Sequence, residues 1–429
     1  MILSFKNKTA VVLVLLFGAF LPSKAQVTSS QIDSLVDEAM SKFNVAGLAI
    51  GVVQDGKIIH SKGYGYTNAE TKKSVTENTN FAIASNSKAF TATAMAILVE
   101  QGKLKWDTKV KSIIPEFTMY NSYVTDNFTI EDLLSHHSGM GLGQGDLMWF
   151  PDGNDFKIED MLKAFADVTP EAGFRTEMQY NNILFFIAGE VIARVSGMSW
   201  EDFIAKEIME PIGMESSVTS INRIGSLELA KPHTSVSGKL VVLPDYAPQV
   251  NGAAAGIYAN VNDLCNWMML NLNHGTFGDT TIFHMKTQED HLWKMQTVTS
   301  PNRNPKYNAH FGGYGLGWFL GDLNGNLVVS HSGGMPGMLS KTTLITDKNV
   351  GIVILTNTSD DGAMVFSALT NTLVDAFVGV ESADWIGKYA RYYKNNSAFA
   401  DSVLQAAWAK VDYKKAGPYD KGITGTYQD

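Results

Sequence analysis

Cysteine is nearly absent from this chain of 429 residues, in which Cys265 is the single example. One thiol cannot form a disulfide within the chain, so a fold held together by internal cross-links is excluded. Cys265 lies in the segment Asp263-Leu-Cys-Asn-Trp267, which has helical character. This setting favours a small buried packing residue over a reactive thiol.

Basic residues are in deficit as well, with 34 Lys and Arg against 43 Asp and Glu and a net charge of −9 at pH 7. The first 25 residues hold three of the lysines and no acid, which leaves 31 basic and 43 acidic residues and a net charge of −12 for the rest. An acidic chain without a basic patch predicts that nucleic acid and anionic membrane surfaces are not partners.

Long apolar runs are missing after residue 26, so no transmembrane segment is predicted there. The apolar run 9–21 is short for a bilayer span, follows Lys6 and Lys8, and precedes Ser23-Lys24-Ala25. This order predicts a signal peptide over residues 1–25, cleaved after Ala25, and hence a periplasmic or secreted protein. An uncleaved N-terminal anchor is the alternative.

Low-complexity tracts and internal repeats are absent too, and 45% hydrophobic residues with 18% charged ones is typical of globular proteins. Helical periodicity covers residues 27–43, with Ser29 and Ser30 as N-cap candidates, and a second terminal helix is predicted over 361–378. Strand-like segments, the first two joined by a hairpin turn at Asp55-Gly56, are 48–53, 57–66, 326–330, 341–346 and 350–356.

These segments predict a fold of two lobes. Isolated hairpins are marginal, so the strands from both ends of the chain are expected to form one antiparallel sheet flanked by the terminal helices. Residues from about 80 to 310 are mostly helical and loop-like and are expected to form a second lobe. The cleft between two lobes is the default place for a site.

The first candidate motif is Ser85-Asn86-Ser87-Lys88, at the start of a helix-forming run that ends before Gly102. Residues three apart face the same side of a helix, so Lys88 is predicted to point at Ser85. A serine hydroxyl needs an adjacent base, and a lysine serves when burial lowers its pKa. Ser-x-x-K alone is a weak signal, because an N-cap serine with a solvated lysine has the same pattern.

Two further motifs follow at long spacings. Tyr180-Asn181-Asn182 precedes an apolar helical run, and an aromatic staple with a capping asparagine is the structural alternative for it. His331-Ser332-Gly333-Gly334 follows the strand-like segment 326–330. Glycines at a strand end allow a substrate to approach the backbone closely.

With these three motifs in this order, the chain resembles the serine β-lactamase and penicillin-binding-protein superfamily, for which Ser-x-x-K is a known signature. Tyr-x-Asn is similar to the class C and D-aminopeptidase/esterase branch, and no Ser-Asp-Asn motif of class A is found. The resemblance covers residues 30 to about 380 and includes 45–51, 81–85, 133–139, 253–256 and 315–318.

The resemblance implies an α/β (α+β) fold of the β-lactamase/DD-peptidase type, with a catalytic domain over residues 26–380. It implies Ser85 as nucleophile, Lys88 as its base and Tyr180 as proton shuttle. Asn182 would orient Lys88 and substrate, and His331 with Gly333 would line the substrate site. The backbone N–H groups of Ser85 and Gly334 would then hold the oxyanion.

The chain departs from the β-lactamase pattern at the third motif, where Lys-Thr-Gly is replaced by His331-Ser332-Gly333. A histidine is mostly neutral near pH 7 and binds a substrate carboxylate less firmly than a lysine. The resemblance therefore favours a D-amino-acid peptide or amide, or a small ester, over efficient β-lactam hydrolysis. A β-lactamase proper, and a penicillin-binding sensor that acylates without turnover, are the alternatives.

No cofactor is predicted, and the partner expected is a small-molecule or peptide substrate. His136 and His137 could suggest zinc, but no third ligand is spaced nearby, so no metal site is predicted. Residues 381–429 are interpreted as a linker helix followed by the start of a truncated domain. Its segment 422–427 resembles the first strand of the lipocalin-like β-domain that follows the catalytic domain in some relatives.

Overall fold

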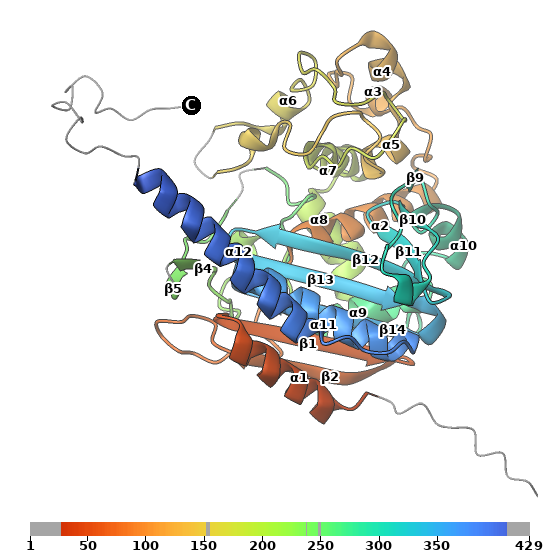
Figure 1. The fold of residues 1–429 in the computed structure, drawn as a ribbon. Helices are drawn as coiled ribbons and strands as arrows, with labels where there is room; N and C mark the ends of the chain where they lie inside the picture. The colour runs from red at the N-terminus through yellow and green to blue at the C-terminus, as the bar shows by residue number, and fades with distance from the viewer. Residues whose placement is uncertain (1–26, 152–154, 237, 248–249, 410–429) are drawn as a thin grey trace, which may run out of the picture.

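The computed structural model describes residues 27–409 except 152–154, 237 and 248–249. The centre of the molecule is an eight-stranded sheet in the order β2-β1-β14-β13-β12-β11-β10-β9, with every neighbouring pair antiparallel (Figure 1). Its strands are β1 (Gly47–Gln54), β2 (Lys57–Gly65), β9 (Thr297–Val298), β10 (Gly312–Tyr314), β11 (Phe319–Leu323), β12 (Asn326–Met335), β13 (Met338–Ile345) and β14 (Val350–Thr356).

The sheet joins the two ends of the chain, as predicted. β1 pairs with β14 from Leu48 opposite Thr356 to Gln54 opposite Val350, so residues about 300 apart in sequence form one ladder. Both strands are buried on both faces, which explains their continuous apolar composition. The predicted fold class, an antiparallel sheet flanked by helices, is confirmed.

One face of the sheet is covered by α1 (Ser29–Lys42) and α11 (Asp361–Val378), with α12 (Trp385–Trp408) lying across them (Figure 1). Ile352 and Ile354 of β14 pack on this side, whereas Val353 and Leu355 face the larger core on the other. This alternation has the period of two that a strand imposes. The N-cap of α1 is Thr28, which forms a capping box with Gln31, rather than Ser29 or Ser30 as the sequence suggested.

The opposite face supports the mostly helical lobe. The helix α9 (Val261–Leu272) packs so closely on β1 that a side chain at Gly51 would lie 2.8 Å from Cys265 Sγ, and Cys265 is buried there as expected. The remaining elements are α2 (Ser87–Glu100), α3 (Val110–Ile113), α4 (Ser122–Asn127), α5 (Ile130–Leu134), α6 (Ile158–Met161), α7 (Ile183–Ser196), α8 (Trp200–Ile204), α10 (Met285–Thr287) and the short strand pairs β3 (Phe81–Ala82) with β6 (Tyr258–Ala259), β4 (His233–Val236) with β5 (Lys239–Val242) and β7 (Thr276–Phe277) with β8 (Thr280–Thr281).

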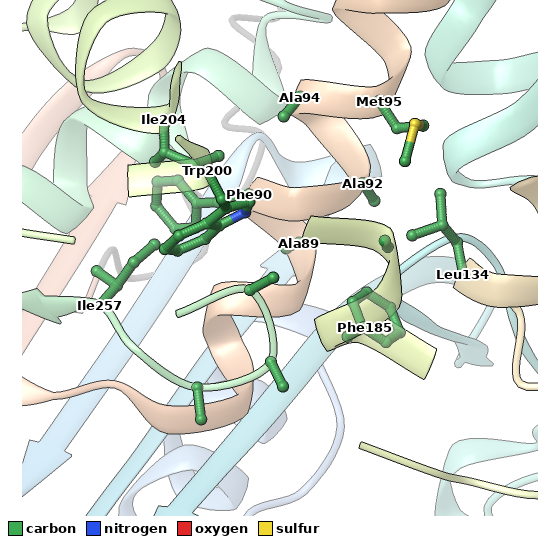
Figure 2. Packing of buried hydrophobic residues seen from close by; sticks show 14 of the residues in the cluster. Ala89, Phe90, Ala92, Ala94, Met95, Leu134, Phe185, Trp200, Ile204 and Ile257 are labelled. Carbon is green, nitrogen blue, oxygen red and sulfur yellow. The ribbon is translucent and has the colours of Figure 1, made fainter. Parts of the chain in front are cut away.

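The helix α2 runs through the middle of this lobe and is buried along its length until Val99. Figure 2 shows Phe90 beside Trp200 on one side of α2, with Phe185 of α7 on the other. Trp200 also donates from Nε1 to Thr91 Oγ1 at 3.0 Å, which satisfies two buried polar atoms at once. A helix enclosed in this way holds the residues at its N-terminus in a fixed position.

Two sequence predictions about strands are corrected. β12 does not end at Ser330 but continues to Met335, so the third motif lies inside a strand. The strands β9, β10 and β11 were not predicted, because they are short and the two glycines of β10 interrupt the usual strand composition. The longer β12 brings the third motif against the Ser85 turn, and the three short strands extend the sheet beyond β12.

The predicted signal peptide and the segment 422–427 lie outside the described residues. A helix, α12, is found within the segment 381–429, and hydrogen bonds from Tyr393 to Asp361 and from Trp385 to Asp375 join it to α11; its role as a linker stays a prediction. Within the described ranges no single helix has the length and apolarity to cross a membrane. The stretches 183–196 and 200–212 meet those criteria only as a pair, bent by 76°.

Candidate active site

Ser85 lies at the point where the chain enters α2. It belongs to a short 3-10 turn, Ala84–Asn86, that immediately precedes the helix. Between Thr79 and Leu98 every residue is buried except Ser85. The backbone of Ala84 has a φ of +46°, a conformation that is uncommon for residues other than glycine and recurs at functional sites. The local fold therefore presents one hydroxyl on an otherwise closed segment.

Lys88, one helical turn after Ser85, has a fully buried side chain. Its Nζ lies 3.0 Å from Ser85 Oγ, 2.8 Å from Asn182 Oδ1 and 3.0 Å from the carbonyl oxygen of Ala254. No carboxylate forms an ion pair with Lys88 among the described residues. Burial lowers the pKa of Lys88 to about 7, and the more distant charge of Asp146 acts in the opposite direction. Lys88 can therefore exist as a neutral amine near neutral pH.

Tyr180 covers Lys88 from the other side. The Lys88 Nζ atom is 5.0 Å from the centroid of the Tyr180 ring, and the ring in turn packs on His136 with centroids 4.3 Å apart. Burial raises the pKa of the Tyr180 hydroxyl, while its hydrogen bond with Ser85 acts in the opposite direction. Tyr180 thus contacts both Ser85 and Lys88, and its role in passing a proton between them stays a prediction.

Asn182 occupies the N-cap position of α7 but makes no capping hydrogen bond. Its side chain instead bridges Lys88 and Asp146, with Asn182 Nδ2 3.2 and 3.3 Å from the two carboxylate oxygens. The neighbouring Asn181 accepts from the backbone N–H of Ile183. The structural alternative for the second motif, a capping asparagine, therefore applies to Asn181 and not to Asn182.

His331 is buried on β12, and both nitrogens of its ring are engaged. Nδ1 lies 2.6 Å from the carbonyl oxygen of Ser332, and Nε2 lies 3.2 Å from the hydroxyl of Tyr314. A carbonyl only accepts, so Nδ1 carries the proton and Nε2 accepts from Tyr314. Burial, with Lys88 as a smaller cause, lowers the pKa of His331 to about 3. This ring is neutral and has no free donor to offer a carboxylate.

The glycines of the third motif allow β12 to run directly against the Ser85 turn. A side chain at Gly333 would lie 2.1 Å from the carbonyl oxygen of Ile83 and 2.9 Å from the backbone nitrogen of Ser85, so only glycine fits there. Gly334 is the next residue and pairs with Leu339 of β13. The backbone N–H groups of Ser85 and Gly334 as oxyanion donors remain a prediction.

Asp146 is a part of this cluster that the sequence analysis missed. It follows the glycine-rich segment 139–145, in which Gly139, Gly143 and Gly145 all have positive φ. Alternating glycines before a lone acid were the available signal, because they indicate a backbone that turns tightly to reach a specific place. Which side chain Asp146 reaches could not be read from that pattern.

His136 and His137 make hydrogen bonds around the site and do not contact Ser85 through them. His136 Nδ1 accepts from the backbone N–H of Asn181 at 3.2 Å, and His137 lies between the hydroxyls of Ser135 and Thr297. Among the side chains that the structure describes, no group of three or more His, Cys, Asp or Glu is placed to hold a metal ion. His136 positions the loop before α7, and His137 links its own loop to β9.

Comparison with known proteins places this arrangement in a family. The Beta-lactamase family model matches residues 32–376. Unguisins hydrolase ungD' of Aspergillus campestris is 28% identical, with 82% of this chain and 66% of the relative covered. Protein flp of Staphylococcus aureus is 25% identical, with 78% and 64% covered. This chain thus spans slightly less than two thirds of the length of these relatives.

Solved structures agree with the family match. The octameric penicillin-binding protein homologue from Pyrococcus abyssi is 25% identical, with a TM-score of 0.67 over 80% of this chain and 77% of that one. EstCE1, described as a hydrolase with promiscuous acyltransferase activity, shares the fold with a TM-score of 0.64 at 20% identity, covering 78% and 94%. A family model that matches most of the chain, together with this shared fold, shows that the protein belongs to the Beta-lactamase family.

Proposed function

We propose that this protein is a serine hydrolase that cleaves amide, ester or lactam bonds through an acyl-enzyme on Ser85. The observation that carries the proposal is the buried amine of Lys88, which lies 3.0 Å from Ser85 Oγ and pairs with no carboxylate of the residues that the structure describes. A neutral amine has two N–H groups and one lone pair. When Asn182 Oδ1 and Ala254 O accept the two N–H groups, the lone pair faces the Ser85 hydroxyl.

The chemistry follows from these positions. The proton of Ser85 passes to the neutral amine of Lys88 while Ser85 Oγ forms a bond to the substrate carbonyl carbon. The oxyanion is held by backbone N–H groups, each worth roughly 3 kcal/mol of the barrier. Tyr180 then returns the proton to the leaving amine or alcohol as its bond to carbon breaks. Water then attacks the acyl-enzyme carbonyl while Lys88 accepts its proton. The bond to Ser85 Oγ breaks, Ser85 is reprotonated, and the carboxylic acid product is released.

A substrate without a carboxylate next to the scissile bond suits this site best, because His331 is neutral and both of its nitrogens are engaged. We therefore propose a D-amino-acid peptide or amide, or a small ester, as the substrate class. A relative named as a hydrolase of unguisins and a neighbour described as a hydrolase support turnover rather than stoichiometric acylation. The proposed periplasmic or secreted location rests on residues 1–25 alone.

The direct test of this function is a substrate panel of D-amino-acid amides, short p-nitrophenyl esters and nitrocefin. Continuous release of product from at least one amide or ester supports the proposal. A burst of one equivalent of p-nitrophenol per Ser85 that then stops would instead identify a sensor that acylates without turnover. Fast nitrocefin hydrolysis with slow ester cleavage would identify a β-lactamase.

The activity should depend on pH through Lys88. Only the neutral amine can accept the Ser85 proton, and with a pKa of about 7 its neutral fraction falls as the pH drops below that value. We expect kcat/KM for a neutral ester to fall about tenfold per unit below pH 6 and to level off above pH 8. A pH–rate profile between 5 and 9, corrected with the Ser85→Ala variant, measures this. A flat profile would contradict Lys88 as the base.

The change His331→Lys should alter substrate preference more than turnover. A lysine, once ionised, places a positive charge beside the site, so kcat/KM for a carboxylate-bearing ester should rise about tenfold relative to its neutral methyl ester. His331→Gln is the matched control, since it replaces the ring without adding charge. An unchanged preference in the lysine variant would show that residue 331 does not face the anionic end of a substrate.

A further inference from the structure

The side-chain amide of Asn182 lies between two partners of opposite character. On one side, Asn182 Oδ1 is 2.8 Å from Lys88 Nζ. On the other, Asn182 Nδ2 is 3.2 and 3.3 Å from the oxygens of Asp146, one of which also accepts from Trp149 Nε1 at 2.9 Å. A carboxylate at neutral pH accepts hydrogen bonds and donates none. The Asp146 carboxylate therefore fixes which end of the amide faces Lys88.

The orientation of this amide decides where the lone pair of Lys88 points. Asn182 Oδ1 and Ala254 O can only accept hydrogen bonds, so the neutral amine of Lys88 donates both of its N–H groups to them. A flipped amide would present Nδ2 to Lys88, and that donor would compete with the Ser85 hydroxyl for the lone pair. The base would then be directed partly at Asn182, and Ser85 would lose its proton acceptor.

The chain holds Asp146 in place through the glycine-rich segment before it. Asn181 Nδ2 donates to the carbonyl oxygens of Gly141 and Gln144, at 3.0 and 2.8 Å. Gly145 has a φ of +86°, and a side chain there would come within 2.8 Å of Ile183 Cγ1. The segment is thus attached to the first turn of α7 by Asn181, the residue next to Asn182.

We propose that Asp146 is a positioning residue that locks the Asn182 amide and thereby aims the Lys88 lone pair at Ser85. This inference rests on the proposed function and deepens it, because it concerns the base of the same acylation step. Asp146 does not need to contact the substrate or the reacting atoms.

The charge of Asp146 gives the proposal a second readout. The titratable or charged groups around Lys88 are His331 of β12, His136 and Tyr180 from two loops, and Asp146 from the 3-10 turn Asp146–Met148. The two histidines are neutral because burial lowers their pKa values, and burial keeps Tyr180 protonated. Asp146 is the one anion of this set, and it raises the pKa of Lys88 against the effect of burial.

The test is Asp146→Asn, assayed by the pH dependence of fluorophosphonate labelling of Ser85 and of p-nitrophenyl ester hydrolysis. An asparagine can donate as well as accept, so the Asn182 amide is no longer locked, and the plateau rate should fall at least about tenfold. The lost charge lowers the pKa of Lys88, so the acidic limb should move to lower pH. Asp279→Asn, which removes an exposed carboxylate at the β7–β8 turn, is the matched control and should change neither quantity.

A swapped variant, Asp146→Asn combined with Asn182→Asp, distinguishes an effect on the orientation of residue 182 from a general loss of stability. Position 182 then offers Lys88 an acceptor again, and residue 146 donates to it. Labelling should recover at high pH, with the acidic limb moved upward by the new adjacent charge. An unchanged plateau and limb in Asp146→Asn, or no recovery in the swap at any pH, would overturn the positioning role.

Failure of the proposed function looks different. If the wild-type protein neither labels nor hydrolyses any ester, Ser85 is not activated, and both the function and the role of Asp146 are wrong. If the wild type labels but turns over none of the panel, the hydrolase proposal fails. The labelling rates of the Asp146 variants then still decide the positioning role.

Discussion

Replacing Ser85 with alanine is expected to reduce ester hydrolysis at least about a thousand-fold and to abolish labelling by a fluorophosphonate probe. Ser85 Oγ is the atom 3.0 Å from the Lys88 amine, and the change removes this nucleophile while leaving the neighbouring backbone in place. Steady-state kinetics with a p-nitrophenyl ester and gel-based labelling measure the two effects. Ser41→Ala, at an exposed position on α1, is the matched control.

The fold should survive this substitution. Ser85 is partly exposed and its side chain fills no part of the buried core, so the melting temperature should change by only a few degrees. Activity above about a hundredth of the wild-type rate would exclude Ser85 as the nucleophile. If the variant loses activity because it unfolds, labelling of the wild-type protein at Ser85 decides whether Ser85 is the nucleophile.

Much of the fold could be predicted from the sequence because its strands and terminal helices carry clear periodicity. The hairpin at Asp55-Gly56 and the helix 361–378 appear where the sequence placed them. The strand β12 was predicted too short because glycines normally weaken strands. At Gly333 the glycine is required instead, because β12 must pass within contact distance of Ile83 to reach the Ser85 turn.

The residues of the site were predictable to different degrees. Ser85 and Lys88 are one helical turn apart, so local geometry alone brings them together. Tyr180 lies 95 residues after Ser85, and its position beside Lys88 could be predicted only from the resemblance to a known family. Asp146 could not be predicted, because its contact with Asn182 is set by how the glycine-rich loop packs on α7. No local pattern in the sequence encodes that contact.

Lys88→Met and Tyr180→Phe are each expected to slow acylation of Ser85 about a thousand-fold, and the double variant only slightly more. We propose that both groups serve one proton path, because Lys88 Nζ lies 3.0 Å from Ser85 Oγ and the Tyr180 hydroxyl forms a hydrogen bond with Ser85. Groups that act as one unit show losses that do not add. Pre-steady-state labelling rates at pH 8 measure the three variants against the wild type.

The two substitutions were chosen to leave the surrounding packing intact. Phenylalanine keeps the ring that packs on His136, and methionine fills the channel of the Lys88 side chain without an amine. Removing the amine leaves Asn182 Oδ1 and Ala254 O without their donor, so some loss of stability is expected for Lys88→Met alone. A double variant in which the two losses multiply, to about a million-fold, would mean that Lys88 and Tyr180 contribute independently to the acylation barrier and do not share a proton path.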